Sequence, residues 1–194
     1  MSDFNEAIIL EYVKLIYQER DCKKQVENLP AGYLQSKTIK GKSYCYLQYR
    51  VGQKIKSEYI KKDKIEEISF KINQRRDLEK ELKLIRNQKK SIESIIDKDI
   101  LNVQFIKQGV CNVAKEYREI TRIFLFGSRA GANYREDSDV DLIFETSEAM
   151  SYMKQNEIRM KLEETLGMKV DLIHGPIKDN DFLTVNKEIL LYAA

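Results

Sequence analysis

The chain has 194 residues, of which 42% are hydrophobic and 34% are charged, and its net charge is +3. This length accommodates one large domain or two small ones, and the high charged share indicates long solvated helices. The composition excludes a membrane-spanning segment, because no run of about 18 apolar residues occurs, and the first residues lack the pattern of a secretory signal peptide, so we expect a cytoplasmic protein.

The first part of the chain predicts an antiparallel helical hairpin. Residues 4–27 place apolar side chains at the spacing of one helical face, namely Ile9, Tyr12, Val13, Ile16 and Tyr17. Residues 61–100 repeat that spacing without Gly or Pro, which predicts a second long helix. Arg75 and Lys89 fall near its seam, so pairing within the chain is favoured over a long parallel coiled coil, although a homodimer through the hairpin stays open.

Between these helices, residues 33–60 predict a three-stranded antiparallel meander. The segment is rich in Tyr, Ile and Val, with turns at Gly41 and Gly52. Residues 37–64 hold nine Lys plus Arg, interleaved with Tyr44, Tyr46, Tyr49 and Tyr59. Lysines neutralise phosphates and tyrosines stack on bases, so the meander is a candidate site for RNA or a protein partner. The alternative is a sheet whose tyrosines pack on the hairpin while lysines protect its edges.

The second part predicts a mixed sheet covered by helices. We expect a helix near 101–117, a strand at 122–126, a short helix after Gly127, a strand at 140–145, a helix at 151–166 and a strand at 169–173, with residues 188–192 docking back. The predicted fold class is α+β, with a hairpin-and-meander domain at 1–100 and a mixed-sheet domain at 101–194. The first 120 residues carry 25 Lys plus Arg against 18 Asp plus Glu, whereas the remainder carry 9 against 13. That asymmetry is typical of a catalytic domain that gathers carboxylates, joined to a part that attracts polyanions.

Three aspartates predict a metal site. Asp139 and Asp141 are two residues apart on a predicted strand, so their carboxylates share one face. The run from Val140 to Ile143 is echoed by the run from Val170 to Ile173, which would bring Asp171 to the same face if the strands are neighbours. Clustered carboxylates repel unless cations lie between them, and two Mg²⁺ ions with one oxygen left to accept a proton suit phosphoryl-type transfer.

A phosphate-binding turn is predicted directly upstream. The apolar strand at 122–126 runs into Gly127 and Ser128, where glycine lets the backbone approach a phosphate and the hydroxyl adds a donor. Arg129 and Arg135 are candidate phosphate contacts, although arginines in such loops are often plain surface residues. For His174, a structural place at a strand end is favoured over a role as proton shuttle.

The run LFGSRAGANYREDSDVDLIFE resembles the signature of the DNA polymerase beta superfamily of nucleotidyltransferases, in particular the minimal nucleotidyltransferases of toxin–antitoxin pairs. The resemblance covers about residues 100–194. It implies that Gly127, Ser128 and Arg129 bind the nucleotide, that Asp139 and Asp141 bind two Mg²⁺, and that Asp171 completes the metal site or acts as base. Where the family often continues GSRARG, this chain has Gly131 and Ala132.

Two functions follow as expectations. The first is a Mg²⁺-dependent nucleotidyltransferase that moves a nucleoside monophosphate from an NTP, with ATP the first choice, to a hydroxyl of a protein, an RNA or a small molecule. The resemblance further implies an antitoxin-like member of a toxin–antitoxin pair. The second is a non-catalytic module that binds nucleotide or nucleic acid.

Overall fold

The computed structural model describes residues 3–131, 134–135, 137–176 and 187–194. The chain divides into two compact units, one formed by residues 14–92 and the other by residues 1–13 together with 93–194. Helices combine with a three-stranded and a four-stranded sheet, which confirms the α+β class. The boundary at residue 100 stays a prediction about domain limits. None of the helices in the described part of the chain has the length and apolar character needed to cross a membrane.

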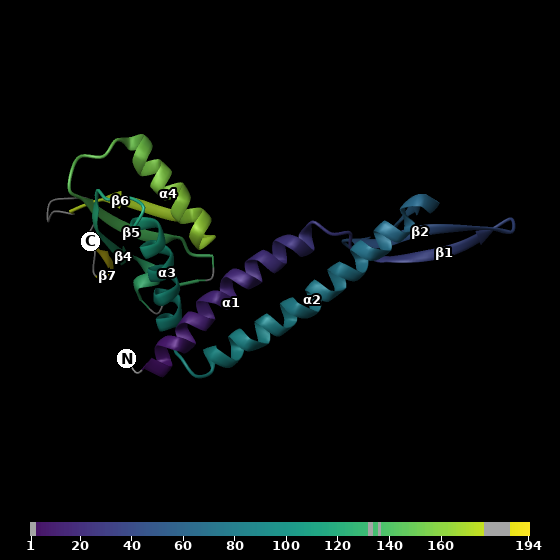
Figure 1. The fold of residues 1–194 in the computed structure, drawn as a ribbon, viewed down its shortest axis with the longest axis horizontal. Helices are drawn as coiled ribbons and strands as arrows, with labels where there is room; N and C mark the ends of the chain where they lie inside the picture. Colours follow the sequence, from purple (N-terminus) through teal and green to yellow (C-terminus); the bar gives the residue numbers. More distant parts are fainter. Residues whose placement is uncertain (1–2, 132–133, 136, 177–186) are drawn as a thin grey trace. The chain divides into compact units, whose positions relative to one another are not determined.

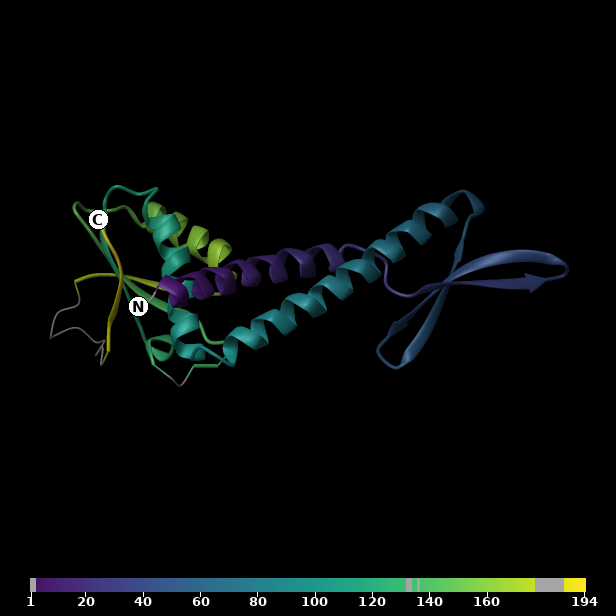
Figure 2. The same ribbon diagram turned by 60° about the horizontal axis from the view of Figure 1, so that its bottom comes forward.

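In the unit of residues 14–92, α1 (Asp3–Glu27) and α2 (Ile65–Glu93) run antiparallel, as Figures 1 and 2 show. Their interface is apolar and consists of Leu15, Cys22, Leu82 and Ile85, with Leu78 and Ile92 packed around them. Arg75, predicted near the seam, donates from Nη1 to the carbonyls of Val26 at 2.6 Å and Leu29 at 2.7 Å. These bonds add a side-chain donor to carbonyls at and just after the end of α1, where helical partners run out.

The second helix is shorter than predicted. A 3₁₀ turn, η1 (Lys62–Lys64), precedes α2, and α2 ends at Glu93 instead of continuing to residue 100. The next helix, α3 (Lys98–Ala114), begins after Asp97, whose carboxylate accepts a hydrogen bond from the Asp99 amide at 2.8 Å. An aspartate that satisfies a first-turn amide starts a new helix here, so the apolar spacing alone overestimated the length.

The meander between α1 and α2 consists of β1 (Tyr33–Ile39), β2 (Lys42–Val51) and β3 (Lys54–Ile60). The strands are antiparallel in the order β1-β2-β3, as predicted. Lys40 and Gly41 connect β1 to β2 with φ values of 50° and 76°, the left-handed conformation of a tight hairpin turn. One face of the sheet packs on α2, where Leu47 and Ile60 contact Ile72.

The other unit contains a mixed sheet in the order β6-β5-β4-β7. Its strands are β4 (Ile120–Phe126), β5 (Val140–Thr146), β6 (Val170–His174) and β7 (Ile189–Ala193). β4 is antiparallel to β5 and β7, whereas β5 and β6 are parallel and joined through α4 (Tyr152–Leu166). Ser151 caps the start of α4, and Gly167 ends it in the left-handed conformation.

The core of this unit lies between the sheet and the helices α3 and α4. Val140, Leu142 and Phe144 of β5 are fully buried, as are Ile158 and Leu162 of α4. The alternate residues of β5 lie on the opposite face of the sheet. The two helices approach closely at Gly109, where an added Cβ would lie 2.5 Å from Leu166 Cδ2.

Candidate active site

Three strands meet at one edge of the mixed sheet. β4 ends there, while β5 and β6 begin there, because β4 is antiparallel to β5 and β5 is parallel to β6. In the register, Phe126 pairs with Asp141, and Asp141 pairs with Asp171. Gly127, the residue after β4, therefore lies beside Asp141, and the two aspartates lie on the same face. The two Val-Asp-Leu-Ile segments, at 140–143 and 170–173, therefore pair with each other residue by residue in the sheet.

Gly127 allows the turn after β4 to lie directly against the Asp141 carboxylate. Its φ is +69°, and a Cβ built on it would lie 2.0 Å from Asp141 Oδ2. The expected short helix is a single 3₁₀ turn, η2 (Ser128–Ala130), closed by hydrogen bonds from the amides of Ala130 and Gly131. Ser128 is exposed at the start of this turn. The predicted phosphate-binding turn therefore lies directly beside the Asp141 carboxylate.

The three aspartates influence one another electrostatically. Asp139 and Asp171 are exposed, whereas Asp141 is half-buried. Burial raises the pKa of Asp141, and the negative charges of Asp171 and Asp139 raise it further, against a smaller opposite effect of Arg129. Their oxygens are the hard ligands that Mg²⁺ prefers, and a cation would relieve their repulsion. Within the described residues, no three acidic, histidine or cysteine side chains already converge as a ready metal site.

Arg129 lies behind the turn, with only 3% of its surface exposed. Its Nε donates to the Ser138 carbonyl at 2.9 Å, its Nη1 donates to Asn102 Oδ1 at 2.8 Å, and its guanidinium stacks 5.1 Å from the centre of the Tyr134 ring. Burial lowers its pKa, while nearby charges that include Asp139 and Asp141 oppose this shift. The side chain thus ties the 3₁₀ turn to α3 and to the approach to β5. Sequence reasoning missed both partners. Asn102 lies in no recognisable motif, and Ser138, although it belongs to the signature run, contacts Arg129 through its backbone carbonyl.

His174 lies at the far end of β6 from Asp171. Its Nε2 is 3.0 Å from Thr146 Oγ1, and its ring meets the Phe144 ring edge to face at 4.9 Å between centroids. These contacts fit the structural place that the sequence favoured for this histidine. Of the two candidate phosphate contacts, Arg135 is exposed, and its amide donates to Ser138 Oγ at 2.9 Å.

A cavity of about 830 Å³ opens beside the aspartates, on the side of β6. Asp139 and Asp171 line it together with residues 167–170 and with a polar stripe on α4, formed by Tyr152, Asn156, Arg159 and Glu163. Arg159 donates to Glu163 and to Asn156, each at 2.8 Å, and Glu163 accepts from the Val170 amide at 3.2 Å. The helical spacing of this stripe was visible in the sequence, but nothing there indicated that α4 borders the site.

Comparison with known proteins identifies two regions. Residues 108–192 match the family described as polymerase beta, nucleotidyltransferase, and residues 12–69 match a domain of unknown function, DUF6788. A putative protein adenylyltransferase of Methanocaldococcus jannaschii is 34% identical over 49% of this chain and 98% of its own length. The protein adenylyltransferase MntA of Thermococcus cleftensis is 36% identical over 47% of this chain and 96% of its own.

Among solved structures, a toxin–antitoxin complex with AMP-PNP is similar with a TM-score of 0.33 and 22% identity, over 35% of this chain and 56% of that one. The two adenylyltransferases match almost over their full length, and the family match spans every strand of the mixed sheet up to Tyr192. The chain therefore belongs to the polymerase beta family of nucleotidyltransferases, with a minimal nucleotidyltransferase domain in its C-terminal half.

Proposed function

We propose that this nucleotidyltransferase moves a nucleoside monophosphate, with AMP from ATP the first choice, to a hydroxyl of a protein acceptor. The main observation that supports this proposal is that Gly127 lies against Asp141 and that Asp141 pairs with Asp171 at one edge of the sheet. The names of the relatives, protein adenylyltransferases, support the choice of adenylyl group and protein acceptor for this chain.

The nucleotide phosphates would bind at the end of β4. Gly127 lets the turn lie directly against the Asp141 carboxylate, and the exposed Ser128 hydroxyl next to it is a donor for a phosphate oxygen. The interactions of Arg129 favour a positioning role, because its guanidinium holds the turn instead of facing solvent. Asp139, Asp141 and Asp171 would hold two Mg²⁺ ions, which neutralise charge on the phosphate oxygens when bound.

The transfer is an in-line displacement at the α-phosphorus. The acceptor oxygen forms a bond to phosphorus, the bond from phosphorus to the bridging oxygen breaks, and pyrophosphate leaves with that electron pair. The acceptor proton passes to a carboxylate oxygen of Asp171, the aspartate on the side away from Gly127. Attack and departure lie on opposite sides of phosphorus, so a leaving group at β4 requires an acceptor that enters from β6.

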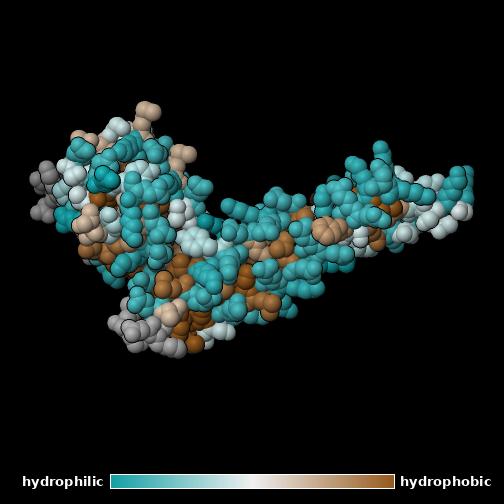
Figure 3. Space-filling model, viewed as in Figure 1, coloured by the Kyte–Doolittle hydropathy of each residue, from teal (hydrophilic) through white to brown (hydrophobic). Residues whose placement is uncertain are grey.

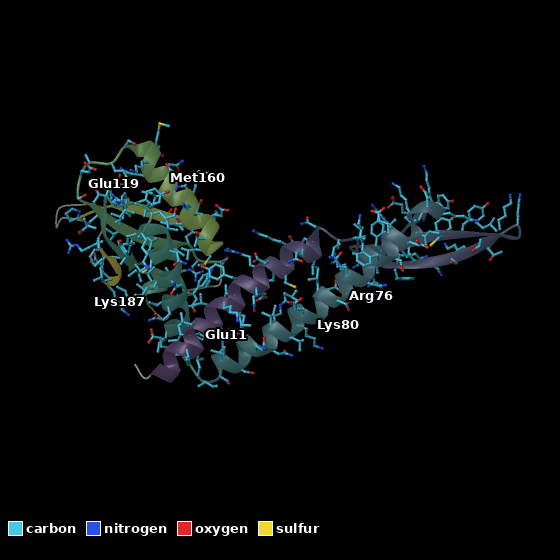
Figure 4. All side chains as sticks on the ribbon, viewed as in Figure 1. Glu11, Arg76, Lys80, Glu119, Met160 and Lys187 are labelled. Atoms are coloured by element: carbon cyan, nitrogen blue, oxygen red, sulfur yellow. The ribbon has the colours of Figure 1, made fainter. Side chains whose placement is uncertain are left out.

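The cavity on the β6 side supports this direction of entry. Asp139 and Asp171 line it, whereas Gly127 and Ser128 do not. On α4, Tyr152 and Met153 are 82% and 84% exposed, and Met160, labelled in Figure 4, is 58% exposed. Exposed methionine and tyrosine side chains beside a polar cavity are typical of surfaces that bind proteins. We infer that α4 guides a protein hydroxyl toward Asp171.

The experiment is to incubate the full chain with Mg²⁺ and each α-labelled NTP in cell extract, with and without nuclease and protease. Label should enter protease-sensitive material, from ATP above the other nucleotides. Asp141→Asn should abolish this transfer, whereas Glu145→Gln, which removes a carboxylate farther along the same face of β5, should retain it. Absence of transfer with every nucleotide would contradict the proposal and favour the alternative of a non-catalytic binding module.

Two proposals about assembly accompany this function. The resemblance to minimal nucleotidyltransferases of toxin–antitoxin pairs supports an antitoxin-like role, in which the acceptor is a partner toxin. The amphipathic hairpin supports a homodimer. Light scattering of the purified chain, alone and with proteins captured from its host, tests both, and a monomer at micromolar concentration would contradict the homodimer.

A further inference from the structure

The three-stranded meander carries a face that the nucleotidyl transfer does not use. Residues that pair directly across neighbouring strands point to the same side of a sheet. The pairs on this side include Tyr33 with Gln48, Gln35 with Tyr46, Lys37 with Tyr44, and Tyr46 with Tyr59. We call this side the tyrosine face. It consists of Tyr33, Gln35, Lys37, Ile39, Lys42, Tyr44, Tyr46, Gln48, Arg50, Ile55, Ser57 and Tyr59.

The opposite face is the one that packs on α2. Leu47, Ile60 and Ile72 form its buried centre, with Leu34 and Tyr49 against them. Because neighbouring residues of a strand point to opposite sides, the tyrosine face is turned away from this core. Of the tyrosines that the sequence singled out, Tyr49 therefore packs on the hairpin, whereas Tyr44, Tyr46 and Tyr59 do not.

The rings on the tyrosine face form a connected group across two strands. Tyr59 meets Tyr46 and Tyr44 edge to face, with centroids 5.8 Å and 6.1 Å apart. Tyr33 donates a hydrogen bond to Gln48 at 2.7 Å, and Gln48 in turn donates to Gln35. Tyr33 and Tyr59 are 48% and 50% exposed. These contacts hold large aromatic surfaces in fixed positions at the surface of the protein.

The charge of this face is uniformly positive. Lys37, Lys42 and Arg50 belong to it, and among residues 33–60, all of which the structure describes, the single acidic side chain, Glu58, lies on the other face. The Lys37 ammonium lies 5.2 Å from the centre of the Tyr46 ring, so a cation and a ring form one surface. Figure 3 shows a mostly hydrophilic surface over the β1–β2 hairpin. A polyanion with flat rings complements such a surface better than an apolar protein patch does.

We propose that the tyrosine face binds single-stranded nucleic acid, with bases stacked on Tyr33 and Tyr59 and phosphates bound by Lys37, Lys42 and Arg50. Stacking needs unpaired bases, and every base offers a ring face, so binding tolerates many sequences. The basic side chains supply the phosphate contacts and make binding depend on salt. This activity belongs to the meander and is independent of the nucleotidyl transfer.

The test is fluorescence anisotropy of the full chain with labelled RNA and DNA strands of about 20 nucleotides, and with the matching duplexes. We expect both single strands to bind more tightly than the duplexes, and the comparison of RNA with DNA identifies the preferred source. The double variant Tyr33→Leu/Tyr59→Leu should bind roughly 30-fold more weakly or worse, because it loses two ring faces while it keeps the charge.

A matched pair of variants separates this face from net charge. Lys37→Gln/Arg50→Gln and Lys54→Gln/Lys56→Gln each remove two positive charges from the same sheet, but the second pair lies on the other face. We expect the first to weaken binding and to reduce the salt slope by about 1.4, and the second to have little effect. Equal losses in both variants, equal binding of duplexes, or full binding by the tyrosine variant would each overturn the proposal. Circular dichroism confirms that each variant is folded.

Discussion

Replacement of Gly127 by alanine tests the contact on which the active-site geometry depends. An added Cβ would lie 2.0 Å from Asp141 Oδ2, whereas real Cβ contacts are not shorter than 3.0 Å. The carboxylate must therefore move by about 1 Å or more, and a displacement of that size at a reacting centre costs roughly 100-fold in rate. Asp141 can swing away, so the main cost to folding is the backbone conformation at φ +69° and ψ −154°, which is almost confined to glycine, at roughly 1–3 kcal/mol.

The assay is the initial rate of label transfer from α-labelled ATP, measured beside the unfolding midpoint of the same preparation. Gly131→Ala is the matched control, because its φ is −123° and the nearest atom to an added Cβ, the Ser128 carbonyl oxygen, is 3.8 Å away. We expect Gly131→Ala to keep its activity. A Gly127→Ala variant with wild-type rate would refute the reasoning that the turn and the Asp141 carboxylate form one site.

Three further predictions concern buried contacts. Arg129→Ala should lower the free energy of unfolding by roughly 2–3 kcal/mol, measured by urea denaturation, because buried hydrogen-bonding partners lose their donor. Gly109→Val should destabilise by roughly 1–3 kcal/mol in the same assay, because the added atoms overlap Leu166. Burial raises the pKa of Glu19, but hydrogen bonds from Lys89 and Arg86 outweigh it and lower that pKa from 4.5 to about 2. A lowered pKa stabilises the fold above pH 4.5 and this contribution is lost as the pH falls to about 2, so Glu19→Gln should flatten the acid side of the stability profile followed by circular dichroism. Unchanged stability in the first two variants, or an unchanged acid slope in the third, would contradict these assignments.

The sequence predicted the mixed sheet well, because its cues are local. Ser151 and Gly167 mark both ends of α4, and the matching runs at 140–143 and 170–173 predicted neighbouring strands that the register confirms. The predicted end of the second long helix, at residue 100, was wrong. A new helix starts after Asp97, and no glycine or proline marks the break in the sequence.

Other features depend on contacts between distant segments. Asn102 meets Arg129 across 27 residues, and no spacing within α3 distinguishes it from a surface residue. Leu15 and Cys22 face α2, although the predicted stripe of α1 left out Leu15 and ended at Tyr17. Which meander face packs on α2 could not be read from composition, because tyrosines occur on both sides of β2. The packing of Leu47 and Ile60 against Ile72 of α2 decides it.

Because β5 and β6 pair in parallel, the number of residues in the connection between them decides whether Asp171 lies beside Asp141. The pairing begins where the Val140 amide donates to the Lys169 carbonyl at 2.9 Å, and Glu163 of α4 accepts from Val170 next to it. Strand residues alternate sides, so inserting or deleting one residue between Gly167 and Val170 would turn Asp171 into the core and Leu172 toward the site. Natural length variation in this protein should therefore spare these few residues and collect instead in the turns of the meander, where an added residue moves no carboxylate.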